Sequence, residues 1–535
     1  MSWGSNLHRL EQIIDASGVS ERIEMLLPIG VRPRQLSART LLIGMLLTLR
    51  DERPAHLVRV HQALRGLPEA DRQRLGVTCQ WKNGPHELTY RQTERTFALA
   101  TRALTTEHPD GKPSQILSEI ADRLLEASVK VLGVPESSSL AIDWSDYESF
   151  ARPPRKRHAP EQKGQTQTPQ STAERPAAAE DEHSPEQPTP DCADPEAAWG
   201  HRNTNHPTRS KTFYGYYLQA VTIVKEDGGP DVPELVRRIT LASCKHDPPA
   251  QIVPVLGRMA TQGVEIGDLL ADSGYAYREP ETFAMPARAA GANLVIDLHP
   301  NDRGMKGTHQ GAILANGNLY CPATPKTLLQ LGPLAPAATQ TELHLHDQKT
   351  QELSRYKLSP LNAADHDGYR RVICPATAGK LRCPHKPTSM SLSHEHPTIT
   401  SPPEHPPTCC AQQTITVPPT VNTKTTQKHD YPSKTHRRSY ARRTAAERSF
   451  SQISDPASTD ISRGWCRLIG LAPNTLFLAC ALITANIRVT DAFTARAAED
   501  ERRHRCGLPS QHRRQRRRNP HDPADQANAP PAIAA

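Results

Sequence analysis

The stretch that decides the fold is Leu140–Asp146, LAIDWSD, a short apolar run that ends in acidic residues. It predicts a strand, and Asp143 comes directly after its apolar residues. Further along the chain, FYGYYLQAVTIV (213–224) and LVRRITLASC (235–244) are rich in aromatic and β-branched residues. The turn-forming segment KEDGGPD (225–231) lies between them, so we expect the two segments to pair as a hairpin.

Helices and strands alternate after this hairpin. Asp247 followed by Pro248 is typical of a helix start, with an N-cap and a proline at the first helical position. IGDLLADSGY (266–275) and NLVIDLHP (293–300) predict strands, and EPETFAMPARAAGA (279–292) between them predicts a helix. The order is therefore strand, insert, strand, strand, helix, strand, helix, strand, which indicates a mixed α/β domain.

Residues 1–135 predict an all-α region ahead of that domain. Ser37 and Ser114 stand as helix caps before apolar-periodic segments. Thr89 and Gln92 form a capping-box pattern at the start of another helix. Helical patterns at these spacings indicate several helices that share one core.

Composition divides the rest of the chain. Proline accounts for 49 of 535 residues and only 4% are aromatic, so part of the chain must be open segment. Residues 152–208 are rich in Pro, Gln, Glu and Thr and predict a disordered insert within the first part of the α/β domain, 136–300. We expect a partly disordered insertion region at 301–434, the C-terminal part of the domain at 435–495, and a basic disordered tail at 496–535.

Charge and hydropathy exclude several classes of protein. The net charge is 65 minus 57, or +8, and eight arginines gather in 502–518, which suggests a polyanionic partner. The apolar run Leu476–Ile483 is far shorter than the ~18 residues that a membrane-spanning helix needs. The first residues lack the apolar core of a secretory signal. We therefore expect a cytoplasmic protein with no membrane association and with reduced cysteines.

Three acidic residues occupy positions that suit a metal-dependent site. Asp143 and Asp272 each follow an apolar triplet that ends a predicted strand, and Glu447 lies on a helix after the long irregular segment. Carboxylates at the ends of adjacent strands, with a third from a packed helix, can hold two hard divalent cations. An aspartate after an apolar run is more often a turn or cap residue, so the pattern alone leaves both interpretations open.

The strand order and the three acids resemble the DDE transposases of bacterial insertion sequences. Tyr440, Arg443 and Glu447 match the Y-x2-R-x3-E part of a Y-x2-R-x3-E-x6-K signature found in one large group of them. LAIDWSD, WGHR with KTFYGYYLQAV, and LLADSGYA are similar to that group's first-strand, second-strand and second-acid motifs. The similar segments cover roughly 140–150, 199–300 and 435–490, which is less than half of the chain.

This resemblance implies an RNase H-like mixed sheet with flanking helices, preceded by the all-α region and interrupted by long low-complexity inserts. It implies metal-dependent cleavage at transposon ends and strand transfer into target DNA. Asp143, Asp272 and Glu447 would bind two Mg²⁺ ions, and Tyr440 and Arg443 would contact DNA phosphate. The implied partner is double-stranded DNA, which the N-terminal region would recognise at the transposon ends, and synapsis of two ends implies a homodimer.

The chain departs from the family pattern at one position and leaves alternatives at others. Ser454 stands where the signature has its final lysine, and Asp146 is a rival to Asp143 as the first metal ligand. A catalytically decayed remnant that only binds DNA, or a metal-dependent nuclease of the same fold, are the rival functions. A zinc site formed by cysteines also stays open, and the candidate ligands are Cys321, Cys374, Cys383 and Cys409 with nearby histidines.

Overall fold

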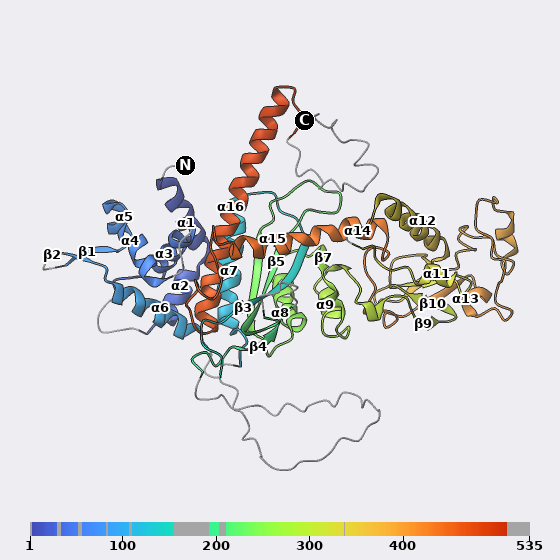
Figure 1. Ribbon diagram of the computed structural model, residues 1–535, viewed down its shortest axis with the longest axis horizontal. Helices are drawn as coiled ribbons and strands as arrows, with labels where there is room; N and C mark the ends of the chain where they lie inside the picture. Colours follow the sequence, from blue (N-terminus) through green and yellow to red (C-terminus); the bar gives the residue numbers. More distant parts are fainter. Residues whose placement is uncertain are drawn as a thin grey trace, which may run out of the picture.

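The structure is a computed structural model that describes residues 3–28, 34–51, 56–81, 84–105, 110–154, 192–202, 210–335 and 337–510. A helical N-terminal region lies at one end of the molecule, a sheet lies at its centre, and the insertion region lies at the other end (Figure 1). The architecture is mixed α/β, as the sequence predicts.

The N-terminal region is built mainly from helices that share one apolar core. The helices are α1 (Trp3–Ser17), α2 (Val19–Leu26), α3 (Ala38–Arg50), α4 (Leu57–Arg65), α5 (Glu69–Arg74), α6 (Tyr90–Leu104) and α7 (Gln115–Leu132). The predicted caps are confirmed, because the side chains of Ser37, Thr89 and Ser114 accept hydrogen bonds from the backbone of the first turns of α3, α6 and α7. The expectation of an all-α region is wrong in one respect, since the region includes a short antiparallel hairpin, β1 (Thr78–Trp81) and β2 (Gly84–Glu87).

The central sheet has six strands. They are β3 (Leu140–Glu148), β4 (Ala198–His201), β5 (Thr212–Ile223), β6 (Val236–Ser243), β7 (Asp268–Ala271) and β8 (Asn293–Ile296). β3 pairs with β5 antiparallel and with β7 parallel, and β7 pairs with β8 parallel. The expected hairpin is confirmed, because β5 and β6 pair antiparallel from Tyr216–Ser243 to Thr222–Val236.

Helices cover both faces of this sheet. α8 (Pro248–Thr261) and α10 (Ala284–Ala289) contribute buried apolar residues to the large core that also contains Leu140 and Ile142 of β3. On the other face, Ala445 and Ala446 of α15 (Thr444–Ser454) pack on Ala141. Figure 1 shows α15 crossing the sheet in front of β3 and β5. Small alanine side chains on both sides let α15 approach the strands closely.

The helix that carries the signature residues is interrupted. α14 (Lys434–Tyr440) ends at Tyr440, a 3-10 turn η3 covers Ala441–Arg443, and α15 begins at Thr444. The prediction that Glu447 lies on a helix is confirmed, since it is part of α15. The two helices continue in the same direction across the interruption (Figure 1).

The last helix, α16 (Leu471–Arg505), is longer than predicted and extends into the segment expected to be a disordered tail. By length and composition it could cross a membrane, and 72% of its apolar window is buried inside the protein. Its buried Asn486 bonds both the N–H and the C=O of Val236, so α16 pairs with the backbone of β6. Burial of this kind is typical of the core helix of a soluble protein. Residues 511–535 of the predicted tail lie outside the described residues.

Part of the segment expected to be disordered is folded into the domain. Within 152–208 the structure describes 152–154 and 192–202, which include β4 at the edge of the sheet. Asp194 is fully buried and accepts hydrogen bonds from the hydroxyls of Ser149 and Tyr216. The remaining residues, 155–191 and 203–209, lie outside the described part of the chain.

The insertion region has structure that the sequence pattern does not predict. One small sheet holds β9 (Met305–His309), β10 (Ala312–Ala315) and β11 (Asn318–Tyr320), and another holds β12 (Ser359–Pro360), β13 (Arg370–Ile373) and β14 (Thr414–Val417). The helices are α11 (Lys326–Leu329), α12 (Gln340–Tyr356) and α13 (Thr408–Ala411). Two small apolar cores hold these elements together, and buried cysteines contribute to both.

Candidate active site

The two predicted aspartates lie side by side on neighbouring parallel strands. Asp272 comes directly after β7, whereas Asp143 lies within β3, which continues to Glu148 and does not end before Asp143 as predicted. β3 and β7 pair Leu140 with Leu269 and Ala141 with Leu270. Asp143 and Asp272 each come two residues after the second of these pairs, so they stand at the same level of the sheet. Because side chains alternate along a strand, both aspartates point to the face that carries Ala141, Leu270 and α15.

The other predicted residues reach this point from a segment about 300 positions away in the chain. The Arg443 guanidinium donates to the Asp143 carboxylate, with Nη1 and Oδ2 3.0 Å apart, and also donates to the Glu447 carboxylate. The Tyr440 ring lies 5.7 Å from the guanidinium carbon of Arg443 and stacks on His436. The fold therefore brings Asp143, Arg443, Glu447 and Tyr440 together.

Burial and mutual repulsion perturb both aspartates. The pKa of Asp143 is raised to about 6, chiefly by burial; Arg443 opposes the shift, and the charges of Asp272 and Glu447 contribute to it. Burial also raises the pKa of Asp272, against the stabilising charge of Arg443. A pair of buried carboxylates that is costly to ionise is typical of a functional site. The pair would gain from any cation placed between its members.

Local packing fixes the orientation of both aspartates. The Trp144 N–H donates to Asp143 Oδ1, and the Gly274 N–H donates to Asp272 Oδ1, each at 2.9 Å. The Trp144 and Tyr275 rings meet edge to face with centroids 4.6 Å apart. A side chain at position 274 would have its Cβ 2.3 Å from the Trp144 ring, so only glycine fits between the second aspartate and this ring.

Asp146, the rival to Asp143 as first metal ligand, takes part in a different set of ion pairs. It lies three residues beyond Asp143 on the same strand, so it projects from the opposite face of the sheet. There it pairs with Arg202 at 3.1 Å, and Glu148 pairs with the same guanidinium. The Arg202 side chain is only 6% exposed. Asp146 is thus a partner of a buried arginine, and the structure favours Asp143 as the residue at the site.

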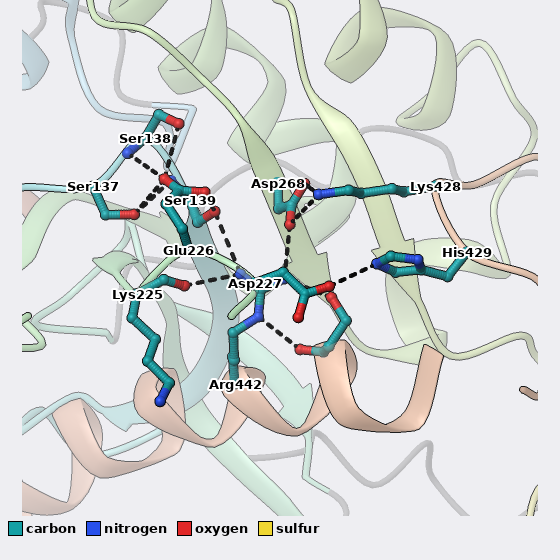
Figure 2. Close-up of polar contacts among 11 residues, drawn as sticks. Ser137, Ser138, Ser139, Lys225, Glu226, Asp227, Asp268, Lys428, His429 and Arg442 are labelled. Atoms are coloured by element: carbon teal, nitrogen blue, oxygen red, sulfur yellow. Dashed lines mark hydrogen bonds and ion pairs between the residues drawn. The ribbon is translucent and has the colours of Figure 1, made fainter. Parts of the chain in front are cut away.

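A polar network anchors the helix segment that bears the signature residues. Asp268 begins β7, and its buried carboxylate accepts from Arg442 at 2.7 Å and from Lys428 at 2.7 and 2.9 Å. Arg442 also donates to the Lys225 carbonyl at 2.8 Å. Figure 2 shows these contacts converging on Arg442 beside the cluster in which Glu226 accepts from Ser137, Ser138 and Ser139.

Consecutive arginines therefore bind acids at two different levels of the sheet. Arg442 binds Asp268 at the start of β7, and Arg443 binds Asp143 just beyond the level where β7 ends. Asp268 lies four positions before Asp272, which corresponds to roughly 13 Å at ~3.3 Å per residue of strand. This double attachment fixes where α15 lies on the sheet, and hence where Glu447 is held.

A third aspartate, which the sequence reasoning missed, continues the row. β7 and β8 pair Leu270 with Val295 and Ala271 with Ile296, so Asp272 and Asp297 stand one step beyond on neighbouring strands. Asp297 accepts from the Tyr431 hydroxyl at 2.8 Å, and its charge contributes to the raised pKa of Asp272. The signal was present in the sequence, because Asp297 also follows an apolar strand directly.

Two further observations bear on a metal site. In the part of the chain that the structure describes, no three His, Cys, Asp or Glu side chains already form a metal-binding group. At this site the Arg443 guanidinium is bonded to both Asp143 and Glu447. Ser454, the position of the signature's lysine, is exposed at the end of α15 and supplies no positive charge.

The chain matches no family model, no curated protein and no solved structure. Functional inference therefore depends on the geometry of the site itself.

Proposed function

We propose that the protein is a DNA transposase of the DDE type that cleaves DNA at transposon ends and transfers the strand into target DNA. The observation that carries the proposal is the pairing of Asp143 and Asp272 on adjacent parallel strands with Glu447 and Arg443 from a distant helix. The strand order β6-β5-β3-β7-β8, with the first three antiparallel and the last three parallel, supports an RNase H-like domain.

The donor set at the site fits Mg²⁺. Mg²⁺ prefers oxygen ligands, and the site offers the carboxylates of Asp143, Asp272 and Glu447. Burial and mutual repulsion raise the pKa of Asp143 to about 6, and a bound cation would relieve that repulsion. Asp143 and Asp272 would hold both ions together with Glu447, once Glu447 leaves Arg443. When bound, two such ions stabilise the attacking and leaving oxygens of a phosphoryl displacement.

Arg443 has the role of binding the scissile DNA strand. Its guanidinium is a planar donor suited to bidentate contact with phosphate, and it lies beside the carboxylates that would hold the ions. Its Nε is buried without a hydrogen-bond partner, so the group has unused donor capacity. Tyr440 lies against the guanidinium and orients it. Arg443 keeps the acids paired in the free protein and turns to phosphate when DNA and cations arrive.

The partners and location follow from this activity. The proposed partner is double-stranded DNA at the transposon ends and in the target, and two copies of the chain would hold the two ends in synapsis. Arginines 502, 503 and 505 at the exposed end of α16 would contact phosphate without reading base sequence. A protein acting on chromosomal DNA in a bacterium works in the cytoplasm.

The test is a cleavage assay on labelled DNA that carries the flanking ends of the gene, run with Mg²⁺ and with EDTA. Glu447→Gln should abolish cleavage and leave DNA binding intact, because the amide keeps the shape but not the charge. Asp455→Asn is the matched control, since Asp455 is an exposed acid just past the end of the same helix. Unchanged cleavage by Glu447→Gln refutes the assignment.

The products separate the proposal from its rivals. Joined molecules of donor and target DNA support a transposase, and nicked products alone support a nuclease of the same fold. DNA that is bound by folded wild-type protein but never cut with Mg²⁺ supports the decayed remnant. The serine at 454 is the observation that favours this last outcome, because it removes a phosphate-binding charge from α15.

A further inference from the structure

Four cysteines of the insertion region face one small cavity. Cys321, Cys374, Cys383 and Cys410 line it, together with His385. The cavity has a volume of about 10 Å³, enough for roughly one water-sized sphere. All four cysteines are between 5% and 8% exposed. Four buried thiols around a space for one atom are a donor set without an assigned function.

The thiols come from four separate segments of chain. Cys321 follows β11, Cys374 follows β13, Cys383 begins a turn closed by its bridge to Lys386, and Cys410 lies in α13. The spacings between them are 53, 9 and 27 residues. These spacings do not match a paired C-x2-C motif, which is why the sequence alone leaves the question open. The tertiary structure brings the four cysteines together around the cavity.

Burial raises the pKa of the Cys321 and Cys383 thiols, and backbone N–H groups oppose that rise. The backbone N–H of Ala323 donates to the sulfur of Cys321, and the N–H groups of His385 and Lys386 donate to that of Cys383. In both cases a proline follows the cysteine and directs the chain into the turn. These N–H groups only partly offset the effect of burial, and they can stabilise each sulfur once a bound ion displaces its proton.

We propose that Cys321, Cys374, Cys383 and Cys410 bind one structural zinc ion that holds the insertion region together. Four thiolate donors in tetrahedral array are the set that zinc takes in structural sites, with Zn–S distances of about 2.3 Å. Each thiol releases its proton to solvent when its sulfur binds the ion. In the described residues the thiols do not already form such a group, so the cavity must contract around the ion.

The neighbouring candidates are excluded by their own contacts. His385 Nε2 lies 2.8 Å from the Pro403 carbonyl, and His394 Nδ1 bonds Arg382 outside the cavity. Cys409 does not line the cavity, and its thiol is hydrogen-bonded to that of Cys410. The fourth ligand is therefore Cys410, one residue beyond the cysteine that the sequence suggested.

A bound zinc ion would add stability that the small apolar core of this region does not provide. The segment from 374 to 413 contains little regular structure, and its core is a small cluster to which three of the four cysteines belong. Small units with little core commonly depend on metals or disulfides for stability. The proposed ion joins the ends of β11 and β13 to α13, so it would connect both small sheets of the region.

The experiment measures metal in the full chain, purified without chelator, by elemental analysis. We expect on the order of one zinc ion per chain. Cys374→Ser and Cys410→Ser should lower the zinc content at least about tenfold. Cys409→Ser is the matched control, because it is equally buried beside Cys410 and should retain zinc. Equal zinc in Cys409→Ser and Cys410→Ser overturns the assigned ligand set.

A measurement on the wild-type chain keeps the proposal testable if the variants do not fold. Zinc is removed with a chelator and Co²⁺ is added, and tetrahedral thiolate coordination gives intense sulfur-to-cobalt charge-transfer absorption. Zinc-free protein that shows no such absorption overturns the proposal, as does a chain that holds iron in place of zinc. Neither result depends on DNA cleavage, so this test is independent of the proposed catalytic function.

Discussion

The raised pKa of Asp143 predicts that the candidate site destabilises the fold. Burial raises this pKa from 3.8 to about 6. A difference of about two units corresponds to roughly 3 kcal/mol between the charged and neutral forms, at 1.36 kcal/mol per unit. At pH 7 the folded protein carries this cost, because the carboxylate is ionised there. Asp143→Asn removes the charge and should increase the free energy of unfolding by about 2–3 kcal/mol.

The direction in which the free energy of unfolding changes with pH follows from the raised pKa of Asp143. Because the folded pKa lies above the unfolded value, the folded state binds the extra proton between about pH 4 and pH 6. Wild-type stability should therefore fall as pH rises through this window, relative to Asp143→Asn. The two proteins should be equally stable below about pH 4, where the aspartate is protonated in both states. Urea denaturation followed by circular dichroism, at several pH values between 4 and 8, measures the difference.

Asp146→Asn is the matched control, because it lies on the same strand and projects from the opposite face. It leaves the buried Arg202 with Glu148 as its remaining carboxylate partner. We expect it to lose about 1–3 kcal/mol at pH 7, the opposite sign to Asp143→Asn. If Asp143→Asn is no more stable than wild type at pH 7, or if the difference persists unchanged at pH 4, the reasoning is refuted. Mg²⁺ should stabilise wild type and not Asp143→Asn.

The remaining predictions concern packing around the site. Asp268→Asn leaves Arg442 and Lys428 beside an uncharged side chain, so it should lower stability by about 3 kcal/mol; a loss below about 0.5 kcal/mol in urea denaturation would contradict the anchoring role. Gly274→Ala brings a Cβ to 2.3 Å from Trp144 and should destabilise the protein by about 1–3 kcal/mol. Gly257→Ala is its control, since a Cβ there meets nothing within 4 Å inside helix α8 and should stabilise by about 0.5–1 kcal/mol. Equal thermal shifts of the same sign in both glycine variants would refute the steric argument.

Local patterns in the sequence were sufficient to predict helices and strands and the types of residue at the candidate site. The caps at Ser37, Thr89 and Ser114 are formed as predicted, because a cap depends only on the side chain and the next few amides. The β5–β6 hairpin is also present, since two β-branched runs that follow one another in the chain, with turn-forming residues between them, pair readily. Low sequence complexity was a poorer predictor of disorder, because Asp194 and β4 within 152–208 are held by contacts with residues distant in sequence.

Local patterns along the chain predicted the order of strands and helices and the acids that directly follow apolar runs. Which of these acids meet depends on how the strands and helices pack. Asp143 and Asp146 look alike in sequence, and the alternation of side chains along β3 sends one to α15 and the other to Arg202. The row that continues to Asp297 depends on strand register, and register is set by packing of the whole sheet. The four thiols around one cavity are spread over 89 positions of the chain, from Cys321 to Cys410, so no local pattern could show that they converge.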